Sequence, residues 1–184
     1  MRALQAIGMG LLLVVLNASV GDPGLDLFPD PVGWGLVLVG LARLPARIPH
    51  RPATTAVAWV ALLVSAVLWV PDLARRLQPV DESFLWLLDL PTPVFVLLLA
   101  RALGSAAGAG EDHRARTWWQ VVMVGTAITI LLPPVVYGAG LVALAVVAVA
   151  VAIGTLVACL VLCFAHSARP WVHDPLPTAG RAPG

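Results

Sequence analysis

Long apolar segments, separated by short loops rich in proline and charge, constrain this chain more than any other feature. Each segment is roughly 17 to 25 residues long, the length of helix that crosses about 30 Å of hydrocarbon. Only 11% of the residues are charged, whereas about 25% is usual for a soluble domain. The sequence therefore predicts an all-α, polytopic bundle of transmembrane helices. Six spans are expected, over residues 4–20, 31–48, 53–70, 83–103, 117–137 and 141–165.

Proline and glycine mark the expected boundaries between these spans. Residues 104–110 are all glycine, serine or alanine and are expected to form a linker after the fourth span. Pro133 and Pro134 are expected to break the fifth helix, because proline has no backbone N–H to continue it. Residues 1–166 thus form one membrane domain, and the proline- and glycine-rich tail, 167–184, is expected to be a disordered cytoplasmic segment.

The arginines indicate how the spans are oriented. All eleven basic residues are arginine, which is typical of a GC-rich bacterial genome. With six crossings, nine arginines fall on the side of the two termini, whereas the opposite loops hold two arginines and six of the ten acidic residues. By the positive-inside rule, both termini are expected in the cytoplasm and the chain in the bacterial plasma membrane. The nine are Arg2, Arg43, Arg47, Arg51, Arg101, Arg114, Arg116, Arg169 and Arg181.

Asp89 is the acidic residue whose position is most costly. It lies about 9 Å along the fourth span from its outer edge, and a carboxylate in hydrocarbon costs about 2.5–3.5 kcal/mol on the insertion scale. One interpretation is a carboxylate facing the bundle interior, with carbonyls freed by the two following prolines and with Arg75 or Arg76 as its partner. The other is that the span begins deeper, so that Asp89 caps a helix starting near Pro91 at the wet interface.

The remaining polar candidates also have two interpretations. Asp22, Asp26 and Asp30 form with Asp89 either an outward-facing acidic mouth that attracts cations or, more simply, a solvated loop that follows the charge bias. The break at Pro133 and Pro134, in a span that also holds Thr126 and Thr129, either lines a permeation path or ends the helix early.

Cys159, Cys163 and His166 share one helical face, because they are spaced i, i+4, i+7. Soft ligands at this spacing suit a metal or a haem. The same face continues through Ala148 and Ala152, however, which is the pattern of a small-residue packing face. Three ligands from one helix also leave a tetrahedral site incomplete. Packing is the favoured interpretation, and no metal or cofactor is expected.

Two glycines of the second span predict another packing face. Gly33 and Gly40 lie seven residues apart and so face the same neighbour, whose backbone can approach closely. Trp34 is expected at the outer headgroup level, where tryptophan anchors membrane helices.

The stretch from Asp26 to Leu44 carries a recognisable pattern. An aspartate, two apolar residues and Pro-Asp are followed by two residues, a glycine and an apolar helix that ends in Gly-Leu. The matching positions are Asp26, Pro29, Asp30, Gly33, Gly40 and Leu41, whereas Pro31 and Trp34 depart from the pattern. The stretch resembles a segment of an uncharacterised family of small integral membrane proteins of Gram-positive bacteria. The resemblance implies a polytopic membrane protein and brings no activity with it.

These features rank the classes of function. The sequence has no phosphate-binding glycine loop, nucleophile elbow or zinc-protease helix, so an enzyme is not expected. A net charge of +1 argues against a nucleic-acid surface. The expected partners are the lipid bilayer and other membrane proteins or a second copy of the chain, and the small-residue faces favour an accessory protein that works through helix packing. The alternative is a transporter or channel for a small cation or polar solute, using Asp89 and the break at Pro133 and Pro134.

Overall fold

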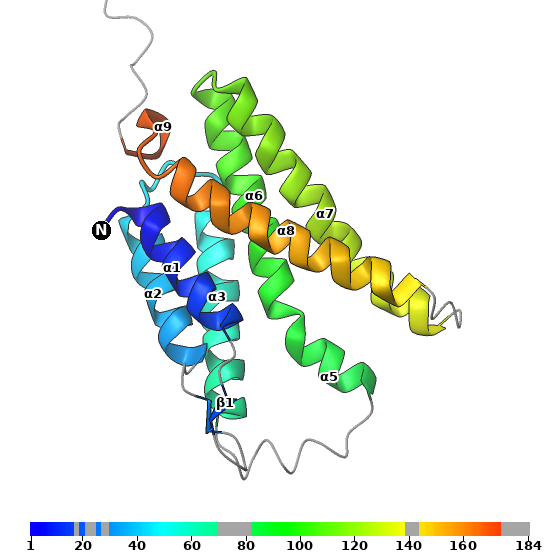
Figure 1. The fold of residues 1–184 in the computed structure, drawn as a ribbon. Coiled ribbons are helices and arrows are strands. Elements are labelled where there is room, and N and C mark those ends of the chain that lie inside the picture. Colours follow the sequence, from blue (N-terminus) through cyan, green and yellow to red (C-terminus); the bar gives the residue numbers. More distant parts are fainter. Residues whose placement is uncertain (17–18, 21–24, 27–29, 70–81, 139–143, 174–184) are drawn as a thin grey trace, which may run out of the picture.

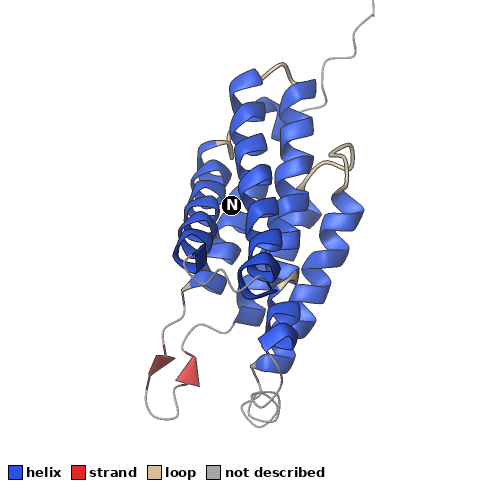
Figure 2. Cartoon of the chain, turned by 90° about the vertical axis from the view of Figure 1, so that its right-hand side faces the viewer, coloured by secondary structure: helices blue, strands red, loops and turns tan. Residues whose placement is uncertain are grey.

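Helices make up nearly all of the described structure. The computed structural model describes residues 1–16, 19–20, 25–26, 30–69, 82–138 and 144–173, and of residues 19–20, 25–26, 82–85 and 137 only the backbone. Within these ranges the one non-helical regular element is a hairpin of two short antiparallel strands, β1 (Ser19–Val20) and β2 (Leu25–Asp26) (Figure 2). Four helices are long and apolar enough to cross a membrane: Arg51–Leu68, Trp86–Ala109, His113–Val136 and Ala145–Ala165.

Six of the helices pack as a closed ring. Along the chain, the described helices are α1 (Ala3–Val15), α2 (Asp30–Arg43), α3 (Arg51–Leu68), α5 (Glu82–Asp89), α6 (Pro91–Ala109), α7 (His113–Gly138), α8 (Ala145–Ala165) and α9 (Pro170–His173). Helix α1 packs against α2, α2 against α3, α3 against α6, α6 against α7, α7 against α8, and α8 returns to α1. The core therefore lies inside a ring of six helices.

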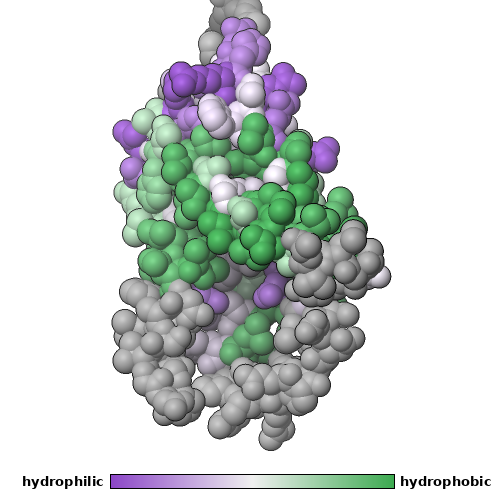
Figure 3. Space-filling model, turned by 45° about the vertical axis from the view of Figure 1, so that its right-hand side comes forward, coloured by the Kyte–Doolittle hydropathy of each residue, from purple (hydrophilic) through white to green (hydrophobic). Residues whose placement is uncertain are grey.

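One end of the bundle collects most of the turns that carry arginine. The N-terminus, the α2–α3 turn, the α6–α7 turn and α9 all lie at this end (Figure 1). We call it the arginine-rich end. Its arginines are Arg2, Arg43, Arg47, Arg51, Arg114, Arg116 and Arg169. On the face drawn in Figure 3, a hydrophobic belt crosses the middle of the molecule, and hydrophilic residues gather at the arginine-rich end.

Several predicted boundaries differ from the structure. The first two predicted spans, 4–20 and 31–48, contain helices of 13 and 14 residues, about 20 Å long, and the described residues hold four helices of spanning length. Helix α2 ends at Arg43 because the chain turns there towards Pro45. The sixth span, expected over 141–165, is α8 from Ala145, and residues 139–143 lie outside the described part.

The predicted linker at 104–110 is wrong, since α6 continues through it to Ala109. Alanine is the best helix former, and the glycines are used for contact with α7. A Cβ atom added to Gly104 would lie 3.3 Å from Cβ of Trp119, and one added to Gly108 would lie 3.1 Å from Cδ of Arg116. The small residues thus bring two helices together.

Helices α1 and α2 approach each other through glycines on both sides. A Cβ atom on Gly40 would lie 2.8 Å from the carbonyl oxygen of Ala3, and one on Gly33 would lie 2.7 Å from that of Gly10. A Cβ on Gly10 would in turn meet the carbonyl oxygen of Gly33. The face shared by Gly33 and Gly40 is therefore filled by a helix of the same chain.

The sequence predicts Trp34 at the headgroup level, whereas the structure places it inside the bundle. Its side chain is 2% exposed and meets Phe95 of α6 edge to face, with ring centroids 5.2 Å apart. It lies next to Gly33 on the inner face of α2. Val37 and Leu41 lie on the same face and are also buried. The helical period thus directs this tryptophan into the core.

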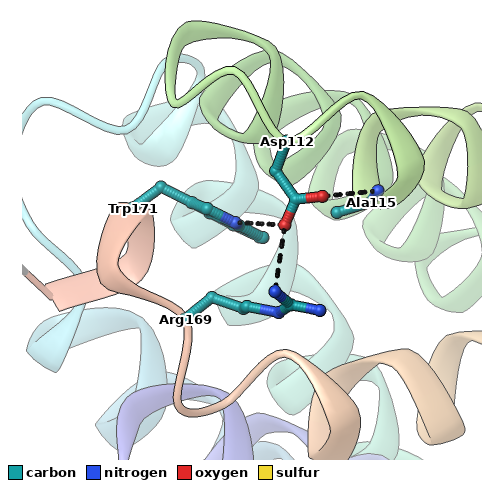
Figure 4. Close-up of polar contacts among 4 residues, drawn as sticks. All are labelled: Asp112, Ala115, Arg169 and Trp171. Atoms are coloured by element: carbon teal, nitrogen blue, oxygen red, sulfur yellow. Dashed lines mark hydrogen bonds and ion pairs between the residues drawn. The ribbon is translucent and has the colours of Figure 1, made fainter.

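The expected disorder of the tail does not begin at Ser167. Trp171 and Val172 of α9 are buried, and Trp171 Nε1 donates a hydrogen bond to Oδ2 of Asp112 at 3.2 Å (Figure 4). Arg169 lies 3.7 Å from the same oxygen. Oδ1 of Asp112 accepts a hydrogen bond from the N–H of Ala115 at 3.1 Å, which caps the start of α7. One carboxylate therefore begins α7 and docks α9. Residues 174–184 lie outside the described part.

The charges around this contact make the docking of α9 more stable at neutral pH than at acidic pH. Burial raises the pKa of Asp112, but the hydrogen bonds from Ala115 and Trp171 and the charge of Arg169 outweigh it, so the net shift is downward. Burial and Arg169 lower the pKa of His166, against the opposing effect of Asp112. The His166 ring lies 5.9 Å from that of Trp171, and its buried Nδ1 has no hydrogen-bond partner among the described residues. This environment suits a neutral imidazole.

The glycine contact between α1 and α2 can be tested with a matched pair of substitutions. Gly40→Ala should lower the free energy of unfolding by about 1–3 kcal/mol, because the added methyl overpacks the contact. Gly35→Ala is the control, since a Cβ at Gly35 meets nothing within 4 Å and should be neutral or stabilising by up to about 1 kcal/mol. Unfolding in detergent micelles measures both. Equal stability of the two variants would contradict the close approach.

The docking of α9 should weaken as the pH falls. Both His166 and Asp112 have folded-state pKa values below their ordinary ones, so the undocked state binds protons first and docking loses stability. Loss should begin below about pH 6.5 for His166 and continue below about pH 4 for Asp112. The ¹⁹F resonance of fluorotryptophan at position 171, assigned with Trp171→Phe, reports docking. Asp112→Asn should remove the lower step, and a resonance that is constant from neutral pH to pH 3 would refute this account.

Candidate functional site

A cavity of about 450 Å³ lies inside the ring, towards the end opposite the arginine-rich end. Helices α1, α2, α5, α6, α7 and α8 all contribute to it, and hydrophilic residues are recessed below the hydrophobic belt at this end (Figure 3). Its volume is within the usual range for small-molecule sites, about 300–1,000 Å³. The lining residues with polar side chains, together with the prolines, are Asp30, Trp86, Asp89, Thr92, Pro93, Thr126, Thr129, Pro133 and Thr155.

Asp89 lies where the fourth span bends. Helix α5 ends at Asp89 and α6 begins at Pro91, and the carboxylate is exposed and lines the cavity. The start of α6 at Pro91 agrees with the second interpretation of Asp89, although among the described residues its side chain makes no capping hydrogen bond. Pro91 and Pro93 cannot donate to the carbonyls four residues earlier, at Leu87 and Asp89. The bend therefore brings together a carboxylate and carbonyl oxygens that lack their helical donors.

Helix α7 supplies a second pair of such carbonyls. The predicted break at Pro133 and Pro134 is wrong, since α7 continues to Gly138 with both prolines inside it. A helix tolerates proline in a membrane when other groups satisfy the freed carbonyls. The carbonyls that lose their donors here belong to Thr129 and Ile130, and both residues line the cavity. The two prolines thus alter hydrogen bonding without ending the helix.

The threonines of the cavity leave acceptors for a ligand. Oγ1 of Thr126 donates to the carbonyl of Val122 at 2.8 Å, and Oγ1 of Thr129 donates to the carbonyl of Gly125 at 3.0 Å. Because each hydroxyl proton is already used, the oxygens can only accept further hydrogen bonds. Among the described lining residues none is basic. The polar part of the lining is therefore rich in acceptors and negatively charged, which suits a cation.

The packed core closes the cavity towards the arginine-rich end. Val96 and Thr126 line the cavity and are only 3% and 2% exposed. One turn further in, Leu99, Val122 and Cys159 belong to the buried core. In this structure the described core therefore closes the cavity towards the arginine-rich end.

The structure gathers some of the sequence candidates and separates others. Asp30, Asp89, Pro133 and Ala152 all line this cavity. Asp30 forms an interaction of its own. Pro134 is not among the lining residues, and Ala148 lines a smaller neighbouring cavity with Ala152 and Pro133.

Part of the predicted acidic mouth cannot be placed. Asp26 lies in β2, and its side chain is not described. Asp22 and the expected partners of Asp89, Arg75 and Arg76, lie outside the described residues.

The other predicted faces are packed within the chain. Cys159 and Cys163 are fully buried, and Gly8 of α1 leaves room for Cys163, whose Cβ would lie 3.2 Å from a Cβ there. His166 instead faces Trp119, at a centroid distance of 6.0 Å. Among the described residues, no three His, Cys, Asp or Glu side chains are grouped so that they could hold a metal ion.

Among the residues of the cavity that could contact a polar ligand, the sequence reasoning did not single out Trp86 and Thr92. Thr92 stands between Pro91 and Pro93, and a polar residue between two prolines in an apolar segment was an available signal. Trp86 gave none, because a tryptophan near a span end is also the pattern of an interfacial anchor.

Comparison with protein-family models, with curated proteins and with solved structures gives no match to this chain. The resemblance of the Asp26–Leu44 stretch to small membrane proteins of Gram-positive bacteria therefore stays a prediction.

Proposed function

We propose that this chain is a multi-pass protein of the bacterial plasma membrane that crosses six times, with both termini in the cytoplasm. Four helices of spanning length and the hydrophobic belt support membrane insertion. The short helices α1 and α2 form an antiparallel pair that starts and returns at the arginine-rich end. This arrangement supports placing the N-terminus and α9 on the same side, whether or not the pair spans fully. The positive-inside rule assigns the arginine-rich end to the cytoplasm.

We propose further that the protein binds a small cation in the cavity, as the first step of transport from the outer side. The observation that carries this proposal is the lining itself: the carboxylate of Asp89, threonine hydroxyls that have already donated, and no basic side chain among the described lining residues. A cavity of about 450 Å³ has room for an organic ammonium ion, and tryptophan, present in the lining as Trp86, is the aromatic residue that attracts such ions best. The proposed function is non-enzymatic.

The accessory function that the sequence favours has lost its main support. It depended on small-residue faces that a partner helix could use. Gly33 and Gly40 pack against α1, and Cys159 and Cys163 lie in the core. The exposed valines and isoleucine of α8, such as Val149, fit contact with lipid as well as they fit contact with a partner helix.

The orientation is tested by cysteine labelling in intact cells. Cys159 and Cys163 are buried, so the unmodified chain should react little with a membrane-impermeant maleimide. Arg47→Cys and Glu111→Cys, both in exposed turns of the arginine-rich end, should be labelled only after the membrane is permeabilised. Labelling of either position in intact cells would show that the orientation is the opposite one, with the cavity on the cytoplasmic side.

Cation binding should depend on Asp89. In detergent, Na⁺, K⁺, methylammonium and tetramethylammonium are titrated against the protein while its melting temperature is recorded. At least one cation should stabilise the protein, by about 1.4 kcal/mol at ten times its Kd, and should be taken up by proteoliposomes. Asp89→Asn should remove both the stabilisation and the uptake.

The matched control is Glu111→Gln, which removes an exposed carboxylate outside the cavity and should leave both readings unchanged. If none of the four cations stabilises the wild type, or if Asp89→Asn responds as the wild type does, the cavity is not a cation site. Binding without uptake would retain the site and exclude transport.

A further inference from the structure

A second, separate groove runs between α6 and α7 near the arginine-rich end. Its volume is about 520 Å³. The groove exists because Gly104 and Gly108 of α6 have no side chains, so that α7 lies close to the α6 backbone. Arg101 and Ser105 border it on α6, and Arg116 and Gln120 border it on α7. Its polar lining is thus two guanidinium groups, a hydroxyl and an amide.

Among the described residues, no carboxylate neutralises either guanidinium. Arg101 and Arg116 are exposed, and within the described residues neither has a hydrogen bond or an ion pair. None of the described residues that line the groove is acidic. The nearby carboxylate of Asp112 is already bound by Trp171, Arg169 and the N–H of Ala115. Arginine stays protonated in proteins, so the groove carries two uncompensated positive charges.

The depth of Arg101 shows which environment supplies the counter-charge. It lies within the spanning segment Trp86–Ala109, about 12 Å along the helix from the end of α6. An arginine at such a depth can reach the interface through its long side chain, and Arg101 borders the same groove as Ser105 and Arg116. Trp118, next to this level on α7, is 48% exposed, as expected of a residue among lipid headgroups.

We propose that this groove is a binding site for the headgroup of an anionic phospholipid. The phosphate lies between Arg101 and Arg116, with Ser105 and Gln120 as further donors. Two guanidinium groups exceed the charge of one phosphodiester, so a headgroup without an ammonium group, such as that of phosphatidylglycerol, is preferred over phosphatidylcholine. Basic pockets between membrane helices on the cytoplasmic side are the type of site that holds anionic headgroups. The site is independent of the cavity at the opposite end.

The test uses the purified full-length protein in a non-ionic detergent. Phosphatidylglycerol, phosphatidylcholine or inorganic phosphate is added, and bound ligand is counted by native mass spectrometry. Phosphatidylglycerol should bind at least about fivefold more tightly than phosphatidylcholine, and Arg101→Gln and Arg116→Gln should each weaken it about fivefold, the effect of one basic residue near a membrane surface. Inorganic phosphate in millimolar excess should not displace it.

Two controls separate the site from general charge and from misfolding. Arg114→Gln removes an exposed arginine of the same helix that does not line the groove, and it should bind phosphatidylglycerol as the wild type does. Arg101→Lys keeps the charge but loses the guanidinium fork, and it should retain more affinity than Arg101→Gln. Equal affinity for the two lipids, equal losses in Arg114→Gln and Arg101→Gln, or full displacement by inorganic phosphate would each overturn the proposal.

Discussion

Hydrocarbon offers no hydrogen bonds, and this constraint connects the features that distinguish the protein. Prolines in α6 and α7 remove helical donors from carbonyls within the spanning segments, and Asp89 brings a charge to the same depth. In lipid each such group costs free energy. Asp89, Thr129 and Ile130, which carry most of these groups, all line one cavity. A ligand or water can therefore satisfy several of them at once.

The two halves of the bundle are packed in different ways. Towards the arginine-rich end, Gly104 and Gly108 of α6 bring α7 close, and Trp119 fills the core. Towards the other end, α1 and α2 stay in close contact through Gly10 and Gly33, whereas α6, α7 and α8 leave room for the cavity. The packed end holds the helices in place, and the cavity lies beyond it.

The sequence predicted the membrane class and the approximate helices, because apolar length follows directly from bilayer thickness. It also marked Asp89, Asp30 and Pro133, which stand out as polar or helix-breaking residues in apolar surroundings. It did not predict that α6 continues through 104–110, nor that Trp34 is buried and α9 docks onto Asp112. Each of these depends on a contact between segments far apart in the chain, such as Gly104 with Trp119 or Asp112 with Trp171. Local pattern carries no information about such pairs.

The ring is closed by α1 and α8, which meet where Gly8 of α1 faces Cys163 of α8. During synthesis α1, α2 and α3 are made long before α8. Until α8 is made, the α1 face that holds Gly8 lacks its partner. The circle of helices can therefore be completed only after α8 has been synthesised. A chain truncated before α8 would leave an open arc, with the walls of its cavity exposed.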